Sequence, residues 1–452
     1  MQRLAIDNLE KWNRNPRRKP LMVWGARQVG KTYLIRDQFA KEYFPDRYVY
    51  VDFALDRDIR EFCMSTVDPG KIIQFISAVR GVAIRSDTLL IFDEIQECPA
   101  IITALKYFCQ DYREYPVIAT GSMVRIKLKR RKRGPGKAES FLFPVGKIDE
   151  LTLYPVSFEE YLLNKNPQQY EMITESWQKK EPLAPAYHDL AMNLLYSYLL
   201  VGGMPEALQT FMDTGDYHES RIVLQGLYNN YLSDMELYQA SPESVLRSKA
   251  IFSQIYSELN KENKDFRASL VEEKARTRDM ETPIDWLTTA CVVQQSWQTA
   301  EHVTAPLRKE DNAAFRLYLN DIGMFTYQSR ENAATFLLKD KKNMLSGIFF
   351  ENYVANELTA YGVPLFYWKG KKSAEMEFVA ELSGRMIPID VKRGRGKLNS
   401  LKAFRDHNVF DTAVKISDQP LGYAEELKLL TVPLYGAFLL AKELGQCSQV
   451  SI

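Results

Sequence analysis

Short apolar runs alternate with amphipathic stretches over the first 155 residues. The runs cover 21–24, 48–53, 88–93, 115–120 and 148–153. Uninterrupted apolar runs of this length, bounded by glycine or polar residues, are typical of buried parallel strands. Between two of them, apolar residues recur at helical spacing at Ile72, Phe75, Ile76, Val79 and Ala83. We therefore expect an α/β fold with a five-stranded parallel sheet covered by helices.

The middle of the chain is predominantly helical by the same criterion. Helical patterns cover 157–164, 187–200, 245–259, 269–275 and 283–292, and β-like runs follow at 292–299 and 315–319. Short helices followed by two β-like runs are the order of elements that is typical of a winged helix. The helix in the recognition position, TPIDWLTTAC, lacks lysine and arginine. It therefore suits a protein contact better than the major groove of DNA.

The last 110 or so residues return to an α/β pattern. Helices are expected at 344–361 and 398–407, and strands at 365–368, 375–380, 386–391 and 412–416. The helical assignment of the first segment depends on Phe350, Val354, Leu358 and Tyr361, which repeat on one face. We expect an α/β domain here.

A glycine-rich loop follows the first apolar run directly. The sequence Gly25-x-x-x-x-Gly30-Lys31-Thr32 joins that strand to a helix, which is the context of a Walker A loop. Its backbone N–H groups can cradle a triphosphate, Lys31 adds positive charge at the β- and γ-phosphates, and the Thr32 hydroxyl can bind Mg²⁺. The expected nucleotide-binding residues are Gly25, Ala26, Arg27, Gln28, Val29, Gly30, Lys31, Thr32 and Tyr33.

Two later strands end in polar side chains that fit the same chemistry. Asp93 and Glu94 close the run LLIFDE, a Walker B pattern in which Asp93 holds Mg²⁺ and Glu94 orients or deprotonates the attacking water. Thr120 or Ser122, after the next strand, resembles the sensor-1 position near the γ-phosphate, and a plain Gly-Ser turn is the alternative. We expect Lys31, Glu94 and Ser122 to be catalytic.

The most basic segment of the chain is 125–137, in which eight of thirteen residues are lysine or arginine. That density is too high for a packed helix face, and Gly134-Pro135-Gly136 indicates a loop. The segment either contacts the phosphates of a nucleic acid or forms a solvated surface loop. The absence of an interleaved aromatic residue gives no support for base stacking.

Charge and cysteine content narrow the classes of function. The 59 basic and 58 acidic residues balance, so DNA affinity would have to come from local patches. The 5 cysteines form no C-x-x-C pair, and the 4 histidines do not cluster, which disfavours a disulfide framework and a histidine metal site. No signal peptide and no uncharged apolar stretch of about 18 residues occurs. We expect a cytoplasmic protein without a membrane segment.

The set GxxxxGKT, LLIFDEIQ, ATGS and LTLYPVSFEEYL resembles prokaryotic AAA-type ATPases that end in a nuclease-like domain of unknown function. The resemblance implies an arginine finger where this chain has Gly146-Lys147, so a bidentate arginine is missing there. It also implies a lid motif near the adenine and ribose at Gly202-Gly203-Met-Pro205, for which a loop-to-helix boundary is the alternative.

The order of elements after residue 341 resembles the PD-(D/E)xK nuclease core. The resemblance implies a second metal site with Glu377, Asp390 and Lys392, and Glu351 as an auxiliary residue. Two carboxylates on adjacent strands can hold a divalent ion, while the lysine positions water. Glu377 stands where aspartate is usual, and Glu375 is a competing ligand on the same strand. A basic cluster at 392–397 would suit a phosphate backbone or a solvated turn.

These observations predict four domains and three alternative functions. The domains are a P-loop ATPase domain (1–155), a helical lid (156–240), a winged-helix-like domain (241–340) and a restriction-endonuclease-like α/β domain (341–452). The first alternative is an ATPase with the cofactors ATP and Mg²⁺ that couples nucleotide state to domain rearrangement. The others are a nucleotide-gated switch with little turnover and an ATP-regulated DNA-binding protein or nuclease. A protein partner would bind the winged-helix-like or C-terminal domain.

Overall fold

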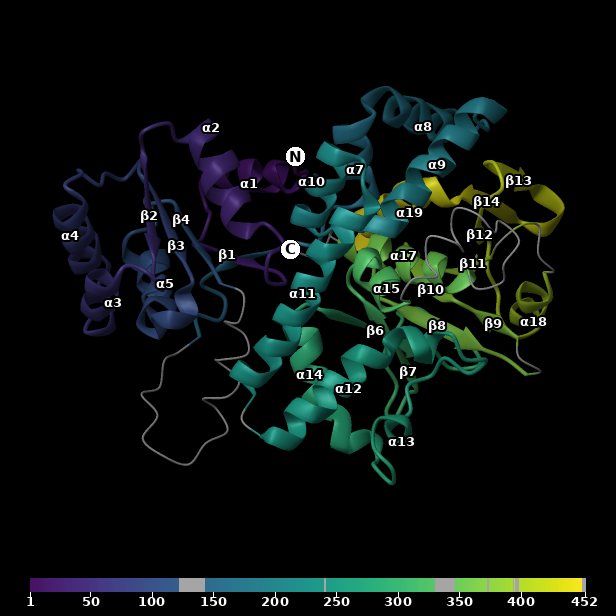
Figure 1. Cartoon of the computed structure of the whole chain (residues 1–452). Helices are drawn as coiled ribbons and strands as arrows, with labels where there is room; N and C mark the ends of the chain where they lie inside the picture. Colours follow the sequence, from purple (N-terminus) through teal and green to yellow (C-terminus); the bar gives the residue numbers. More distant parts are fainter. Residues whose placement is uncertain are drawn as a thin grey trace. The chain divides into compact units, whose positions relative to one another are not determined.

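The computed structural model describes residues 1–121, 143–239, 241–329, 346–371, 374–392, 394 and 398–448. Its chain forms two compact units. The N-terminal unit comprises residues 3–154, and the C-terminal unit comprises residues 1–2 and 155–452. Figure 1 shows the elements of each unit along the colour gradient of the sequence.

The N-terminal unit is built on a five-stranded parallel sheet. Its strands are β1 (Leu21–Trp24), β2 (Tyr48–Asp52), β3 (Leu89–Asp93), β4 (Val117–Thr120) and β5 (Asp149–Thr152). Their order is β2-β3-β4-β1-β5, and every neighbouring pair is parallel. The sheet predicted from the apolar runs is confirmed. Because all strands run the same way, the residues that follow β1 and β3 lie at one edge of the sheet.

Helices pack on this sheet and complete its core. They are α1 (Ala5–Arg14), a helix over Tyr33–Ala40 continued by α2 (Lys41–Tyr43), α3 (Arg57–Met64), α4 (Pro69–Arg80) and α5 (Pro99–Asp111). Buried side chains of α3, α4 and α5 pack against those of the strands in one apolar cluster. The apolar stripe expected on α4 is shorter than the sequence pattern indicated. Gly81, at φ 65°, ends the helix, and Val79 is exposed.

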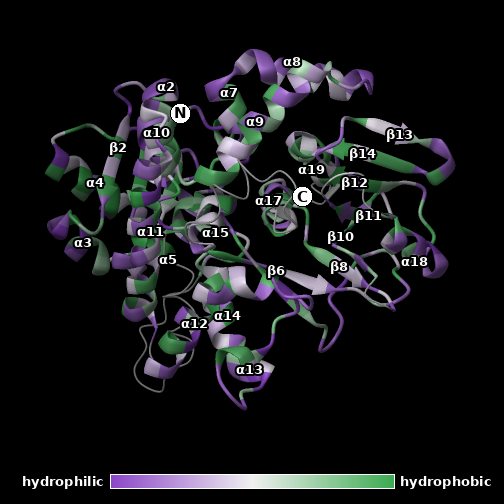
Figure 2. Ribbon diagram, turned by 45° about the vertical axis from the view of Figure 1, so that its right-hand side comes forward, coloured by the Kyte–Doolittle hydropathy of each residue, from purple (hydrophilic) through white to green (hydrophobic). Residues whose placement is uncertain are grey.

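Helices also form much of the C-terminal unit. Their bounds are α7 (Phe158–Lys165), α8 (Pro167–Lys179), α9 (Pro185–Val201), α10 (Pro205–Thr214), α11 (Tyr217–Tyr238), α12 (Pro242–Leu259), α13 (Ala268–Val271), α14 (Glu281–Thr289), α15 (Ile322–Gln328), α17 (Ser346–Ala360), α18 (Asn399–His407) and α19 (Ala437–Ser448). Helix α11 carries both hydrophobic and hydrophilic residues along its length in Figure 2, as expected for a helix with one buried face. No helix in the described part of the chain combines the length and apolar character needed to cross a membrane.

The glycine pair after α9 permits a close backbone crossing inside the C-terminal unit. A Cβ atom on Gly202 would lie 2.4 Å from the Gly323 nitrogen, and one on Gly203 would lie 2.0 Å from the Val156 carbonyl oxygen. Asp321 accepts a hydrogen bond from the Gly203 N–H (2.7 Å). Pro205 then begins α10. Close packing of the backbone therefore requires glycine at positions 202 and 203. The role of these glycines in a lid near the nucleotide stays a prediction.

The described part of the C-terminal unit contains two sheets. The first has the order β7-β6-β8-β9, formed by β6 (Val293–Gln298), β7 (Phe315–Leu319), β8 (Phe366–Lys369) and β9 (Glu375–Met376). The second has the order β10-β11-β12-β14-β13, formed by β10 (Phe378–Leu382), β11 (Arg385–Val391), β12 (Ala413–Ser417), β13 (Gly422–Ala424) and β14 (Leu429–Pro433). The hairpin β6–β7 follows α12–α14 in the order expected of the winged-helix-like segment. However, β6 also pairs with β8, in parallel, from the predicted nuclease-like segment.

Candidate functional site

The loop after β1 has the backbone of a phosphate-binding turn. Gly25 and Gly30 have φ values of 147° and 94°, and Gln28 also lies in the left-handed region at 61°. A Cβ atom on Gly25 would lie 2.4 Å from the Leu153 carbonyl oxygen, so only glycine fits there. The residues named from the sequence are therefore brought together. Ala26 and Val29 are buried, while Arg27, Gln28 and Tyr33 are exposed at the rim of the loop.

Lys31 is buried beneath this loop. Its ammonium donates hydrogen bonds to the carbonyl oxygens of Gly25 (3.0 Å) and Ala26 (2.8 Å). A charged donor beneath a loop of this shape can form charge-assisted hydrogen bonds with phosphate oxygens, which are stronger than bonds between neutral groups. This arrangement fits a nucleoside triphosphate.

Asp93 lies at the end of β3, beside Thr32 at the start of the helix that follows the loop. Its Oδ2 atom accepts hydrogen bonds from the hydroxyls of Thr32 (2.6 Å) and Tyr50 (3.0 Å), and its Oδ1 atom accepts one from the Glu94 N–H (2.9 Å). The carboxylate is buried and held in one orientation. A hydroxyl and a carboxylate oxygen at this distance are ligands of the type that Mg²⁺ takes.

Glu94 has an unusual backbone and a perturbed carboxyl group. Its φ of 49° is left-handed, a conformation that costs about 1 kcal/mol or more for residues other than glycine and clusters at functional sites. Burial raises the pKa of Glu94 above its usual value, and a hydrogen bond from the Gln96 amide opposes this shift. The raised pKa brings the carboxyl group nearer to the range that suits a general base.

The remaining nucleotide-site predictions have different outcomes. Thr120 is fully buried, and its hydroxyl donates a hydrogen bond to the Val23 carbonyl oxygen of the neighbouring strand β1 (3.2 Å). Ser122 and the basic segment 125–137 lie outside the described residues. Lys147 is partly buried in the turn before β5.

Tyr50 and Gln96 belong to this site but were not predicted from the sequence. Tyr50 is in the middle of β2, where alternation places Tyr48, Tyr50 and Asp52 on one partly exposed face. The alternation in the sequence of β2 could therefore have indicated that a polar side chain of this strand lies near Asp93. Gln96 had no comparable signal, because its contact with Glu94 depends on the turn that follows β3.

A second group of predicted residues meets in the C-terminal unit. Glu377 lies between β9 and β10, next to the register pair Phe378–Ile389, and Asp390 follows Ile389 on β11. Lys392 forms an ion pair with Asp390, with 2.7 Å between Nζ and Oδ1. Burial, followed by the charge of Asp390, raises the pKa of Glu377 well above its usual value. The protonated form of Glu377 is therefore favoured beside the Asp390 carboxylate.

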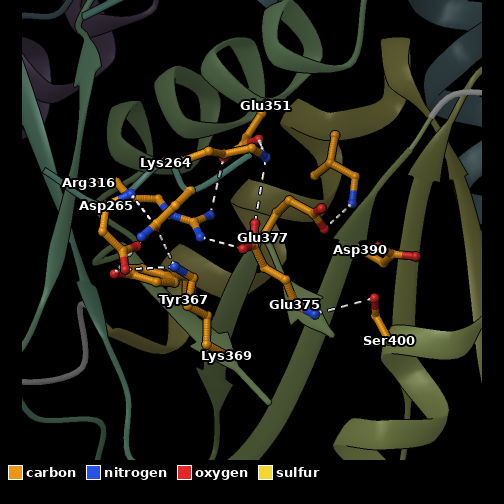
Figure 3. A network of polar contacts seen from close by, with 12 residues as sticks. Lys264, Asp265, Arg316, Glu351, Tyr367, Lys369, Glu375, Glu377, Asp390 and Ser400 are labelled. Carbon is orange, nitrogen blue, oxygen red and sulfur yellow. Dashed lines mark hydrogen bonds and ion pairs between the residues drawn. The ribbon is translucent and has the colours of Figure 1, made fainter. Parts of the chain in front are cut away.

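Glu351 and Glu375 are engaged by basic residues that the sequence analysis did not single out. Arg316, fully buried on β7, approaches Glu375 at 2.6 Å and Glu351 at 3.5 Å. Lys264 forms ion pairs with the same two carboxylates, as Figure 3 shows. Among the described residues, no group of three or more histidine, cysteine, aspartate or glutamate side chains is arranged to hold a metal ion. The metal site at Glu377, Asp390 and Lys392 stays a prediction.

Comparison with known proteins adds three family matches. Residues 17–162 match the model of an AAA domain family, and residues 192–335 and 346–435 match two families described as domains of unknown function, DUF8612 and DUF4143. The first match spans most of the N-terminal unit, so this unit is similar to AAA domains. No curated protein matches the chain. A solved structure, the Walker-type ATPase PABY2304 of Pyrococcus abyssi, is 17% identical with a TM-score of 0.41 over 72% of this chain and 94% of that chain.

Proposed function

We propose that the N-terminal unit binds ATP with Mg²⁺ and hydrolyses it. The observation that carries the proposal is the meeting of Thr32, Asp93 and Glu94 at one sheet edge, with 2.6 Å between the Thr32 hydroxyl and the Asp93 carboxylate. Lys31 lies under the adjoining loop. The match of this segment to an AAA domain family supports the same reaction.

Each of these side chains has a separate role in the proposed reaction. The loop N–H groups and Lys31 bind the phosphates, and Thr32 and Asp93 would hold Mg²⁺. When bound, Mg²⁺ would neutralise charge that develops on the phosphoryl oxygens. Glu94 orients a water molecule and accepts its proton, and Gln96 holds the Glu94 carboxyl group in place. Tyr50 fixes the Asp93 carboxylate.

The test is phosphate release from ATP by the full chain under multiple turnover. We expect turnover with Mg²⁺ and its loss in EDTA, because Thr32 and Asp93 supply ligands suited to a hard divalent cation. Phosphate release unaffected by EDTA would contradict the assigned role of these residues. ATP binding without repeated turnover would instead favour a nucleotide-gated switch, in which binding alone changes the affinity for a partner.

We also propose that nucleotide state is passed from the N-terminal unit to the C-terminal unit. All of the proposed ATP ligands lie in the first of the two compact units, so in this proposal the first unit senses the nucleotide and the second unit responds. The winged-helix-like segment is then the proposed contact for a protein partner, since α14 carries Asp285 and no basic residue.

A second candidate function is contact of the C-terminal unit with DNA, with or without cleavage. It is favoured by the proximity of Asp390 and Lys392 and by the position of the buried Glu377 carboxyl group, whose pKa burial and the charge of Asp390 raise. The test is plasmid cleavage with Mg²⁺ or Mn²⁺, with and without ATP, by the wild type and by Lys392→Ala. We expect no cleavage by the wild type, because the described carboxylates are not arranged around a metal position. Cleavage that disappears in Lys392→Ala would make the protein a nuclease.

A further inference from the structure

The C-terminal unit contains a largely buried ionic network that is balanced in charge without any metal. Its members come from four separate regions of the chain and meet beneath α17 (Figure 3). The cations are Lys264, Arg316 and Lys369, and the anions that they contact are Asp265, Glu351 and Glu375. Buried charges persist only when they are paired, so this equality has a physical cause.

Lys264 has the most unusual place in the network. It is carried by the irregular segment between α12 and α13, and its ammonium contacts Glu351 of α17 and Glu375 of β9. Burial alone would lower the pKa of Lys264, but the carboxyl groups of Glu351, Glu377 and Glu375 raise it above its usual value. The ammonium therefore stays charged among three carboxyl groups. We call Glu351, Glu375 and Glu377 the carboxylate cluster.

The carboxylate cluster depends on Lys264 for part of its neutralisation. The Oε1 atom of Glu351 accepts a hydrogen bond from the Tyr318 hydroxyl (2.6 Å) and lies 3.5 Å from Arg316, whereas the Oε2 atom contacts Lys264. Removing the Lys264 charge leaves one excess negative charge in the network. The Oε2 atom of Glu351 and the Oε1 atom of Glu375, which both contact Lys264, are oxygen ligands of the type that divalent cations take.

A neighbouring side chain gives independent support for a cation position. Asp390, next to Glu377 across the strand pair, is almost fully buried, and its Oδ1 atom lies 2.7 Å from the Lys392 ammonium. Lys415 stands opposite Asp390 on the neighbouring strand β12 and interacts with it electrostatically. A buried carboxylate needs a cation beside it, and at Asp390, as in the carboxylate cluster, that cation is the ammonium of a lysine.

We propose that Lys264 is the resident cation of the carboxylate cluster and excludes divalent cations from it. The inference deepens the second candidate function and is independent of the proposed ATP site. It accounts for carboxylates that converge from a helix and two strand ends and yet form no metal position in this conformation. Withdrawal of the 260–267 segment would open the cluster to Mg²⁺ or Mn²⁺.

The test is Mn²⁺ binding to the full chain without nucleotide, measured from the electron paramagnetic resonance signal of free Mn²⁺. We expect Lys264→Ala to bind one more Mn²⁺ per chain than the wild type, with at least about tenfold higher affinity than any site that the wild type shows in this cluster. Adding Glu375→Gln should abolish the gain. Lys264→Arg, which keeps the charge, and Lys261→Ala, which removes an exposed lysine of the same segment, should behave like the wild type.

Several outcomes would overturn the proposal. One is an equal number of Mn²⁺ ions in the wild type and Lys264→Ala, with both proteins folded by thermal melting. If Lys264→Ala does not fold, Lys264→Met, which keeps the apolar stem, replaces it. Unfolding of both variants would assign Lys264 a purely structural role. Failure to cleave DNA in a variant that has gained Mn²⁺ would contradict the nuclease function alone, and loss of ATP turnover would bear only on the ATP site.

Discussion

Lys31→Ala is expected to lower the affinity for ATP by at least about 100-fold, equivalent to about 2.7 kcal/mol. The wild-type ammonium is buried under the loop, 2.8 and 3.0 Å from two loop carbonyls, where a charge-assisted bond to phosphate is stronger than it would be in water. Alanine supplies neither the charge nor the donors. Isothermal titration calorimetry of the full chain with Mg-ATP measures the change.

Lys41→Ala is the matched control for this substitution. Lys41 is exposed at the far end of the same helical segment, where it pairs with Asp37 (2.8 Å), so its removal should leave ATP affinity unchanged. Unaltered binding by Lys31→Ala would refute the assignment of the loop as the phosphate site. A weakening of equal size in both variants would point to a general effect on the helix.

Glu94→Gln is expected to slow ATP hydrolysis by about 100- to 10,000-fold while ATP binding is retained. Glutamine keeps the size of the side chain and can keep the contact with Gln96, but it cannot accept a proton from water. Because burial raises the pKa of Glu94, turnover by the wild type should fall as the pH decreases through that raised value. The residual turnover of the variant should lack this pH dependence.

Glu114→Gln provides the comparison for the loss of a carboxylate. Glu114 is exposed before β4, at the sheet edge opposite to the loop, and its substitution should not alter turnover. Phosphate release at saturating ATP measures both variants, and calorimetry checks that ATP is bound. Wild-type turnover in Glu94→Gln would remove Glu94 from the catalytic role and leave its left-handed backbone without a catalytic explanation.

The sequence predicted the parallel sheet of the N-terminal unit well because its signals are local. Each strand of the first sheet is a continuous apolar run, and the residues after β1 and β3 are placed by strand direction alone. Helix α5 was missed because Ile101, Ala104, Leu105 and Phe108 are buried along with neighbours on other faces, which leaves no single apolar stripe. Tyr50 required knowledge of which strand lies beside β3.

The C-terminal unit was harder to predict because its key contacts join distant residues. The pairing of β6 with β8 brings together Trp297 and Phe366, and no spacing in the sequence encodes that register. Lys264 and Arg316 look like ordinary charged residues in their own segments. Only the fold shows that both are directed at Glu351 and Glu375.

The sheet β7-β6-β8-β9 and the ionic network limit which other sequences can replace either half of the C-terminal unit. Both matched segments of unknown function, 192–335 and 346–435, contribute residues to the network. Arg316 comes from the first, and Glu351 and Glu375 come from the second. In a fragment that began at residue 346, the edge of β8 that pairs with β6 would be unpaired, and Glu351 and Glu375 would lose their ion pairs with Lys264 and Arg316. Gene fusions that exchange either segment alone would have to preserve the charge pattern of the other.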